Sequence, residues 1–208
     1  MADPTRFLTL NEVLRILKDL KPRTKRSRST HLNLIVFRLS CCCGLRRKEI
    51  AGLRFTDLVL SGAHPCIIIR KDNTKGQRDK RRARKVPLWW DAGTLKDLQE
   101  WVEFRKKMKA RAIDPVVCGV SKANYGRPLT GLLLASRWKT AIRCLGPERV
   151  RQLSIHCGRH SFCSLSKAAG HSSIEIRDAV GHTSEATTNL YLHAVESENI
   201  PDVFAVRS

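Results

Sequence analysis

The residue types that could do chemistry gather in the last quarter of the 208-residue chain. His156 and Arg159 stand three residues apart, and Tyr191 follows His182 by nine. An imidazole titrates near neutral pH and can transfer protons, and a guanidinium can donate to two phosphate oxygens at once. A phenol is only about one part in a thousand ionised at pH 7, so it attacks only with help from a base. The set suits attack on a phosphate, although a lone tyrosine on an amphipathic helix is more often a core residue.

Three short helices are predicted to position these groups. The i, i+3 spacing puts His156 and Arg159 on one face of the first helix, which continues with apolar residues at helical spacing until Gly170 ends it. Gly158 lies inside this helix and is expected to weaken its start by about 1 kcal/mol.

The second and third helices meet at a glycine. Ser172 or Ser173 can serve as the N-cap of the second helix, which ends at Gly181. On one straight helix, a separation of nine residues would put His182 and Tyr191 on opposite faces. The turn at Gly181 removes this conflict, because Tyr191 then lies on a separate third helix.

Five elements in this order resemble the signature of the tyrosine recombinase (phage integrase) family. Its C-terminal half is matched by His156-x-x-Arg159-His160, by Gly181-His182 and by Tyr191. Its Gly-Leu-Arg-x-x-Glu box is matched by residues 44–49, and its β-hairpin lysine by Thr74-Lys75-Gly76. The resemblance spans roughly residues 8–193. Any single element would be a weak signal, so the specificity lies in the combination.

The resemblance implies a role for each matched residue. Arg46 and Arg159 would bind the non-bridging oxygens of a DNA phosphate, and His182 would hydrogen-bond the same phosphate. His156 would transfer protons, and Tyr191 would be the nucleophile. The product would be a 3′-phosphotyrosyl link with a free 5′-hydroxyl. Because this link conserves the bond energy, strand exchange would need no metal, ATP or other cofactor.

A long, basic loop separates the last two predicted strands. From Arg70 to Lys85 it holds nine Lys or Arg against two Asp. A charge run is usually a solvated tip, but on so basic a protein we expect it to reach DNA. The predicted DNA contacts are Lys71, Lys75, Arg78, Lys80, Arg81, Arg82 and Arg84. Lys75 matches the family lysine that protonates the leaving 5′-oxygen, with Lys71 and Lys80 as alternatives because the hairpin is longer than usual.

The rest of the chain predicts a mainly helical α+β fold with a small three-stranded antiparallel sheet. Apolar periodicity indicates helices at residues 13–20, 31–43, 47–53, 89–109 and 131–144. Strand-like segments lie at residues 58–60, 66–70 and 85–88. Pro22 is expected beyond the end of the first helix. Trp89 and Trp90 are expected to be core residues or hairpin anchors rather than platforms for DNA bases.

Composition points to a polyanionic partner. The formal net charge is +20, which makes nucleic acid the default. A membrane binder is disfavoured because the sequence has no long apolar span, and the start lacks the apolar region of a signal peptide. We therefore expect a cytoplasmic protein associated with the nucleoid or host-cell DNA. The basic run at residues 21–28 is either a solvated linker or a phosphate contact.

Eight cysteines indicate reduced, buried thiols rather than a metal site. No pair has C-x-x-C spacing, which disfavours structural zinc. His156, Cys157, His160 and Cys163 could be drawn as a cluster, but one helix cannot wrap four ligands around a tetrahedral ion. In a reducing compartment such thiols act as small hydrophobes.

The resemblance also bears on domains and assembly. We expect residues 1–195 to form one catalytic domain. Residues 196–208 are expected to form a tail that docks either on a neighbouring subunit or on the subunit to which it belongs. The family commonly has a separate N-terminal DNA-clamping domain, for which 208 residues leave no room. The chain is therefore either a catalytic domain without that clamp or a short, invertase-like member. The expected partner is double-stranded DNA, with a homotetramer on DNA and a monomer allowed in solution.

Two other functions fit the same residues. A basic DNA-binding protein of this fold could have lost its activity, but the complete constellation argues against that. A type IB topoisomerase-like enzyme would share the phosphotyrosyl chemistry and relax DNA instead of exchanging strands. Assembly on two DNA sites would distinguish a recombinase from such an enzyme.

Overall fold

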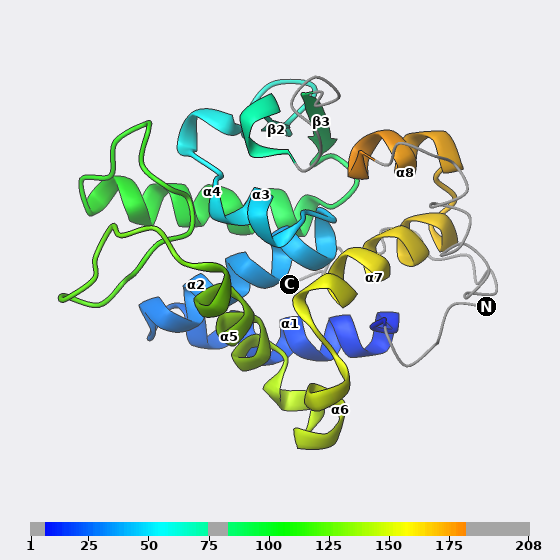
Figure 1. Ribbon diagram of the computed structural model, residues 1–208, viewed down its shortest axis with the longest axis horizontal. Coiled ribbons are helices and arrows are strands. Elements are labelled where there is room, and N and C mark those ends of the chain that lie inside the picture. The colour runs from blue at the N-terminus through cyan, green and yellow to red at the C-terminus, as the bar shows by residue number, and fades with distance from the viewer. Residues whose placement is uncertain (1–6, 75–82, 182–208) are drawn as a thin grey trace.

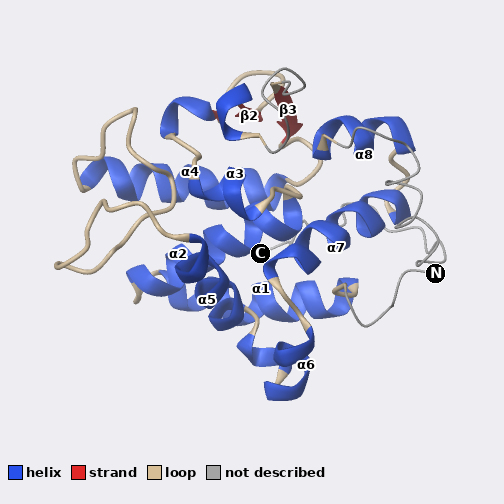
Figure 2. Cartoon of the chain, viewed as in Figure 1, coloured by secondary structure: helices blue, strands red, loops and turns tan. Residues whose placement is uncertain are grey.

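Helices make up most of the structure, and a small sheet lies along one edge (Figures 1 and 2). The computed structural model describes residues 7–74 and 83–181. The helices are α1 (Leu10–Thr24), α2 (Arg28–Phe37), α3 (Arg47–Ala51), α4 (Ala92–Lys107), α5 (Gly131–Ala141), α6 (Pro147–Gln152), α7 (Ile155–Ala168) and α8 (Ser173–Val180). The predicted fold class is confirmed. Within the described ranges, no helix has the length and apolar character to cross a membrane.

The three predicted strands form one antiparallel sheet in the order β1-β2-β3. They are β1 (Leu58–Val59), β2 (Cys66–Ile69) and β3 (Arg84–Pro87). In the centre of the sheet, Ile67 pairs with Leu58 on one side and Val86 on the other. The opposite end of the molecule is built by α1 and α6, whereas β3 contacts α8 beside the sheet (Figure 1).

The first helix runs further than predicted. Thr9 and Glu12 cap its start reciprocally, but Pro22 lies inside its last turn and not beyond its end. The prediction was wrong because the helix continues through the proline to Thr24. Two side chains support this end of the helix: Arg23 Nε donates to the carbonyl of Asp19, and Thr24 Oγ1 donates to that of Lys21. A proline removes only its own N–H from the helix, and the carbonyls that follow it lack helical partners in any case at a C-terminus.

A buried π-helical turn, Arg38–Cys42, continues α2 into the core. The buried Arg38 guanidinium pairs with Asp91 (3.1 Å) and Asp97 (2.7 Å), which ties α2 to α4. Cys41, Cys42 and Cys43 are buried as free thiols, as expected. Burial raises the pKa of Cys41 and of Cys43, so both stay protonated at neutral pH.

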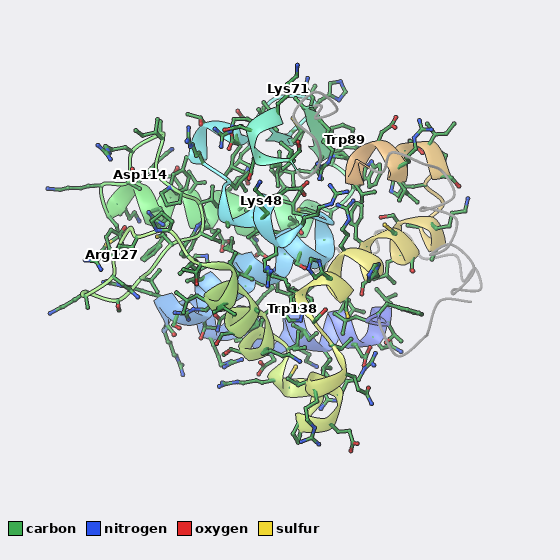
Figure 3. The ribbon with its side chains drawn as sticks, viewed as in Figure 1. Lys48, Lys71, Trp89, Asp114, Arg127 and Trp138 are labelled. Carbon is green, nitrogen blue, oxygen red and sulfur yellow. The ribbon has the colours of Figure 1, made fainter. Side chains whose placement is uncertain are left out.

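Helix α7 approaches the π-helical turn closely because residue 158 is a glycine. A Cβ at Gly158 would lie 2.7 Å from the Trp138 ring and closer still to Ser40 Oγ. Ser40 Oγ also donates to the carbonyl of Ile155 at 2.8 Å. Figure 3 shows Trp138 within the body of the protein. The glycine that weakens the helix in isolation is therefore the residue that lets it pack.

The two adjacent tryptophans have different environments. Trp90 stacks on His171 with ring centroids 3.8 Å apart and on Phe162 with centroids 6.0 Å apart. Trp90 is thus an anchor, as predicted. Trp89 is 53% exposed and meets His64 edge-on at the surface, so it is not a core residue (Figure 3). Sequence alone could not separate them, because side chains of neighbouring residues point in different directions.

The packing at Gly158 predicts a destabilised Gly158→Ala variant. Alanine favours helix, but its Cβ would overlap Trp138 and Ser40, so we expect a loss of about 1–3 kcal/mol in the free energy of unfolding. Urea denaturation of the purified chain measures this quantity. Gly131→Ala is the matched control in α5, since its Cβ would meet only the movable Arg47 side chain. A Gly158→Ala variant as stable as Gly131→Ala would contradict the packing argument.

Candidate active site

Three of the candidate residues meet at the C-terminal end of α8. Ser172 and Glu175 form a capping box at its start, and Gly181 ends it at φ 68°, in the left-handed region. An L-residue with a side chain seldom adopts that conformation, which explains the glycine. The last carbonyls of a helix lack partners within the helix and carry partial negative charge. They therefore attract cations.

Three arginines bind three successive carbonyls at this helix end. They come from β3, from α7 and from the residue preceding α3, which are far apart in the sequence. The pairs are Arg84 Nε with Ala179 (2.9 Å), Arg159 Nη2 with Val180 (2.6 Å) and Arg46 Nη2 with Gly181 (3.1 Å). The fold thus converges three guanidiniums on the turn that directly precedes His182 in the sequence.

Arg159 is the most deeply buried of the three. It is 6% exposed, and its Nη1 donates to the carbonyl of Gly44 at 2.6 Å. Burial, followed by the charge of Arg46, lowers the pKa of Arg159 to about 9. The group is still protonated at pH 7. Two neighbouring guanidiniums held in this way favour a bound anion. The anion would offset both the cost of burying the Arg159 charge and the repulsion between the two cations.

Arg46 is the N-cap of α3 and reaches toward the same place. Its Nη1 pairs with Glu49 Oε1 at 3.0 Å, and its backbone N–H donates to Glu49 Oε2 at 2.8 Å. The side chain remains 25% exposed. Two of its five N–H donors are used by the bonds to Glu49 and Gly181, so the guanidinium has capacity for a ligand.

Glu49 is the residue whose importance the sequence interpretation underestimated. Its side chain is 1% exposed and accepts two parallel hydrogen bonds from Arg84, at 2.9 and 2.8 Å. Burial raises the pKa of this carboxyl, but the hydrogen bonds and charge of Arg84, together with those of Arg46, outweigh burial and hold the pKa below its usual value. The available signal was its place three residues after Arg46 in the matched box.

The base of the basic hairpin is hydrogen-bonded to α3, the helix that carries Glu49. Asn73 Nδ2 donates to the carbonyl of Glu49 at 2.9 Å, and both Asn73 and Thr74 are buried. Lys71 is exposed at the start of the short helical turn Lys71–Asn73 and projects from the edge of the molecule (Figure 3). Lys75 directly follows Thr74 in the sequence and lies outside the described residues.

Of the remaining predicted site residues, two lie in the described part of the chain and the others lie outside it. His156 is exposed in the first turn of α7, one turn before Arg159, as the spacing predicted. Arg84, predicted to contact DNA, turns inward with Val86 on the same face of β3. The candidates outside the described residues are Lys75, Arg78, Lys80, Arg81, Arg82, His182 and Tyr191. In the described part of the chain, no three His, Cys, Asp or Glu residues are grouped to hold a metal ion.

Comparison with known proteins decides the family. The model of the phage integrase family matches residues 6–198, nearly the whole chain. The chain belongs to the phage integrase family. It is 27% identical over 161 residues to the tyrosine recombinase XerH of Helicobacter pylori, which covers 77% of this chain and 41% of that protein. It is also 27% identical over 166 residues to a tyrosine recombinase of Pseudothermotoga lettingae, covering 75% and 47%.

Solved structures of this family share the fold. The XerA recombinase matches 90% of this chain and 58% of its own, with a TM-score of 0.67 and 19% identity. A post-cleavage complex of XerH with a palindromic difH substrate matches 92% and 50%, with a TM-score of 0.67 and 24% identity. The chain thus spans less than half of the two recombinases compared by sequence and about half to three-fifths of these two structures.

The Glu49 cluster predicts a pH-dependent contribution to stability. The folded pKa lies below the usual value near 4.5, so the carboxylate stabilises the fold above that pH and the contribution is lost as pH falls through the folded pKa. Glu49→Gln should lose about 3–5 kcal/mol at pH 7, since it leaves buried guanidiniums uncompensated. Its free energy of unfolding should then fall less steeply than wild type below pH 4.5.

Denaturant titrations between pH 3 and pH 7 measure this difference. Glu148→Gln, which alters an exposed glutamate on α6, is the control and should stay close to wild type at pH 7. Parallel pH curves for wild type and Glu49→Gln would contradict the assignment.

Proposed function

We propose that this protein is a site-specific DNA recombinase that cleaves and rejoins DNA through a 3′-phosphotyrosyl intermediate. Family membership supports the reaction class, and the named relatives are tyrosine recombinases. The proposed catalytic set is Arg46, Lys75, His156, Arg159, His182 and Tyr191. Double-stranded DNA is the proposed substrate, in keeping with the net charge of +20 and with the DNA-bound state of the XerH structure.

One observation carries the proposal. Arg46 and Arg159, separated by more than half of the chain, are held on adjacent carbonyls at the end of α8. Within the described ranges, Glu49 is the only carboxylate hydrogen-bonded to Arg46, and Arg159 donates to the carbonyls of Gly44 and Val180. This leaves a positive site that suits the charge developing on a phosphate under attack.

The chemistry follows from the groups available. The phenolic oxygen of Tyr191 would attack phosphorus and form a new O–P bond. Phosphorus would stay bonded to the 3′-oxygen, and its bond to the 5′-oxygen would break. His156 is proposed to take the phenolic proton, since an imidazole titrates close to working pH. The arginines and His182 would hold the phosphate oxygens, and a hairpin lysine would protonate the 5′-oxygen. Attack by a second 5′-hydroxyl would reverse these steps and join new strands.

Domain limits and assembly belong to the same proposal. We take residues 1–195 as the catalytic domain and residues 196–208 as a docking tail, and a homotetramer as the assembly on DNA. A tetramer would supply four nucleophiles, one for each strand of two duplexes. A topoisomerase-like enzyme would need only one, so the number of strands cut per assembly separates the two reactions.

Covalent trapping tests the nucleophile. Nicked DNA that carries the crossover site, incubated with EDTA, should give an SDS-resistant adduct with wild type and none with Tyr191→Phe. Tyr125→Phe, the other tyrosine of the chain, is the matched control and should retain adduct formation. An adduct that survives Tyr191→Phe would overturn the proposed mechanism, and intact DNA binding without any adduct would favour a catalytically silent binder.

A leaving-group substitution identifies the general acid among Lys71, Lys75 and Lys80. Each is changed to methionine, and cleavage is compared on normal DNA and on DNA with sulfur in place of the leaving 5′-oxygen. A thiolate leaves without protonation, so loss of the acid should slow cleavage of normal DNA by about 10²–10⁴-fold and spare the sulfur substrate. We expect this pattern for Lys75→Met alone. Equal losses on both substrates would instead indicate a binding role.

A further inference from the structure

Arg84 has no role in the chemistry proposed above, yet each nitrogen of its guanidinium donates to the protein. Its side chain is 10% exposed and lies on β3. Nε donates to the carbonyl of Ala179 at 2.9 Å, Nη1 to Glu49 Oε1 at 2.9 Å and Nη2 to Glu49 Oε2 at 2.8 Å. Each of the three nitrogens thus donates to a protein acceptor, and with 10% of the side chain exposed little of the guanidinium is open to a DNA phosphate.

The carboxylate that Arg84 holds also holds Arg46. Glu49 Oε1 accepts from Nη1 of both arginines, and Oε2 accepts from Arg84 Nη2 and from the backbone N–H of Arg46. The parallel pair of bonds from Arg84 fixes the plane of the carboxylate. The orientation of the Arg46 guanidinium is therefore set by Glu49, and that of Glu49 by Arg84.

A second connection runs through the end of α8. Arg84 packs over the last turn so closely that a Cβ at Gly181 would lie 2.8 Å from Arg84 Cδ. The adjoining carbonyls, those of Val180 and Gly181, hold Arg159 and Arg46. By bonding to Ala179, Arg84 thus fastens the helix end on which both other arginines rest.

We propose that Arg84 is a positioning residue for the two phosphate-binding arginines. It aligns Arg46 through Glu49, fastens the end of α8 through Ala179, and does not touch DNA. This inference rests on the proposed function. It requires loss of Arg84 to slow formation of the phosphotyrosyl bond at saturating DNA while the affinity for DNA stays nearly unchanged.

The test uses the full chain as Arg84→Met and Arg84→Lys, with Arg143→Met, an exposed arginine outside the site, as control. Single-turnover adduct formation on nicked DNA is measured at saturating protein, together with the Kd for DNA at several salt concentrations and the thermal unfolding temperature. All rates are taken where each variant is folded.

We expect Arg84→Met to slow adduct formation at saturation by at least about tenfold, because misplaced groups lose alignment with the reacting phosphate. Its Kd and the salt dependence of binding should stay within about twofold of wild type. Arg84→Lys keeps the charge but cannot bridge both carboxylate oxygens and the carbonyl, so it should give an intermediate rate. Arg143→Met should match wild type.

A double-variant cycle checks the route through Glu49. If Arg84 acts through the carboxylate, Arg84→Lys combined with Glu49→Gln should be little slower than the slower single variant. If the rate losses of the two single variants multiply in the double variant, Arg84 does not act through Glu49.

Two other results bear on the whole inference. An unchanged rate at saturation together with a shallower salt dependence would make Arg84 a DNA contact and overturn the proposal. A wild type that forms no adduct would overturn the proposed function and this inference with it, whereas an active wild type with an unaffected Arg84→Met overturns this inference alone.

Discussion

The buried carboxylate of Glu49 is the constraint on which the rest of the site depends. Burying an ion is costly, and a carboxylate with 1% exposure persists because two guanidiniums and a backbone N–H satisfy its oxygens. In return it neutralises part of the repulsion among Arg46, Arg84 and Arg159. Its backbone carbonyl binds Asn73 as well, so one residue connects the arginines to the base of the hairpin.

The end of α8 complements this carboxylate. A helix C-terminus offers a row of carbonyls without partners, and three arginines from separate elements take one each. Hydrogen bonds to neutral carbonyls hold the guanidiniums without cancelling their charge. The site therefore stays positive, since one carboxylate faces three cations, and in the proposed function a DNA phosphate would supply the missing negative charge. Packing and electrostatics act together here, because the close approach at Gly158 fixes the position of α7, and α7 carries Arg159.

Exposure separates the roles of the arginines. Arg46 keeps a quarter of its side chain exposed and has unused donors, which suits contact with a ligand. Arg84 donates from all three nitrogens to the protein and lies nearly buried, which suits alignment of others. In the proposed function the same residue type thus acts at the phosphate in one place and behind it in another, and the direction of the side chain decides which.

The sequence by itself determined the elements and the family, because periodicity, caps and motif spacing are local. The strands, α7, and α8 with its Gly181 end were all predicted from such signals. Arg46 and Arg159 were also named as candidates from their motif positions, and both lie at the end of α8. The tertiary structure alone decided that Arg84 turns inward, that Trp89 is exposed and that Glu49 joins two arginines. These facts depend on contacts between residues far apart in the chain, and a strand's pattern does not say which neighbour its inward face will meet.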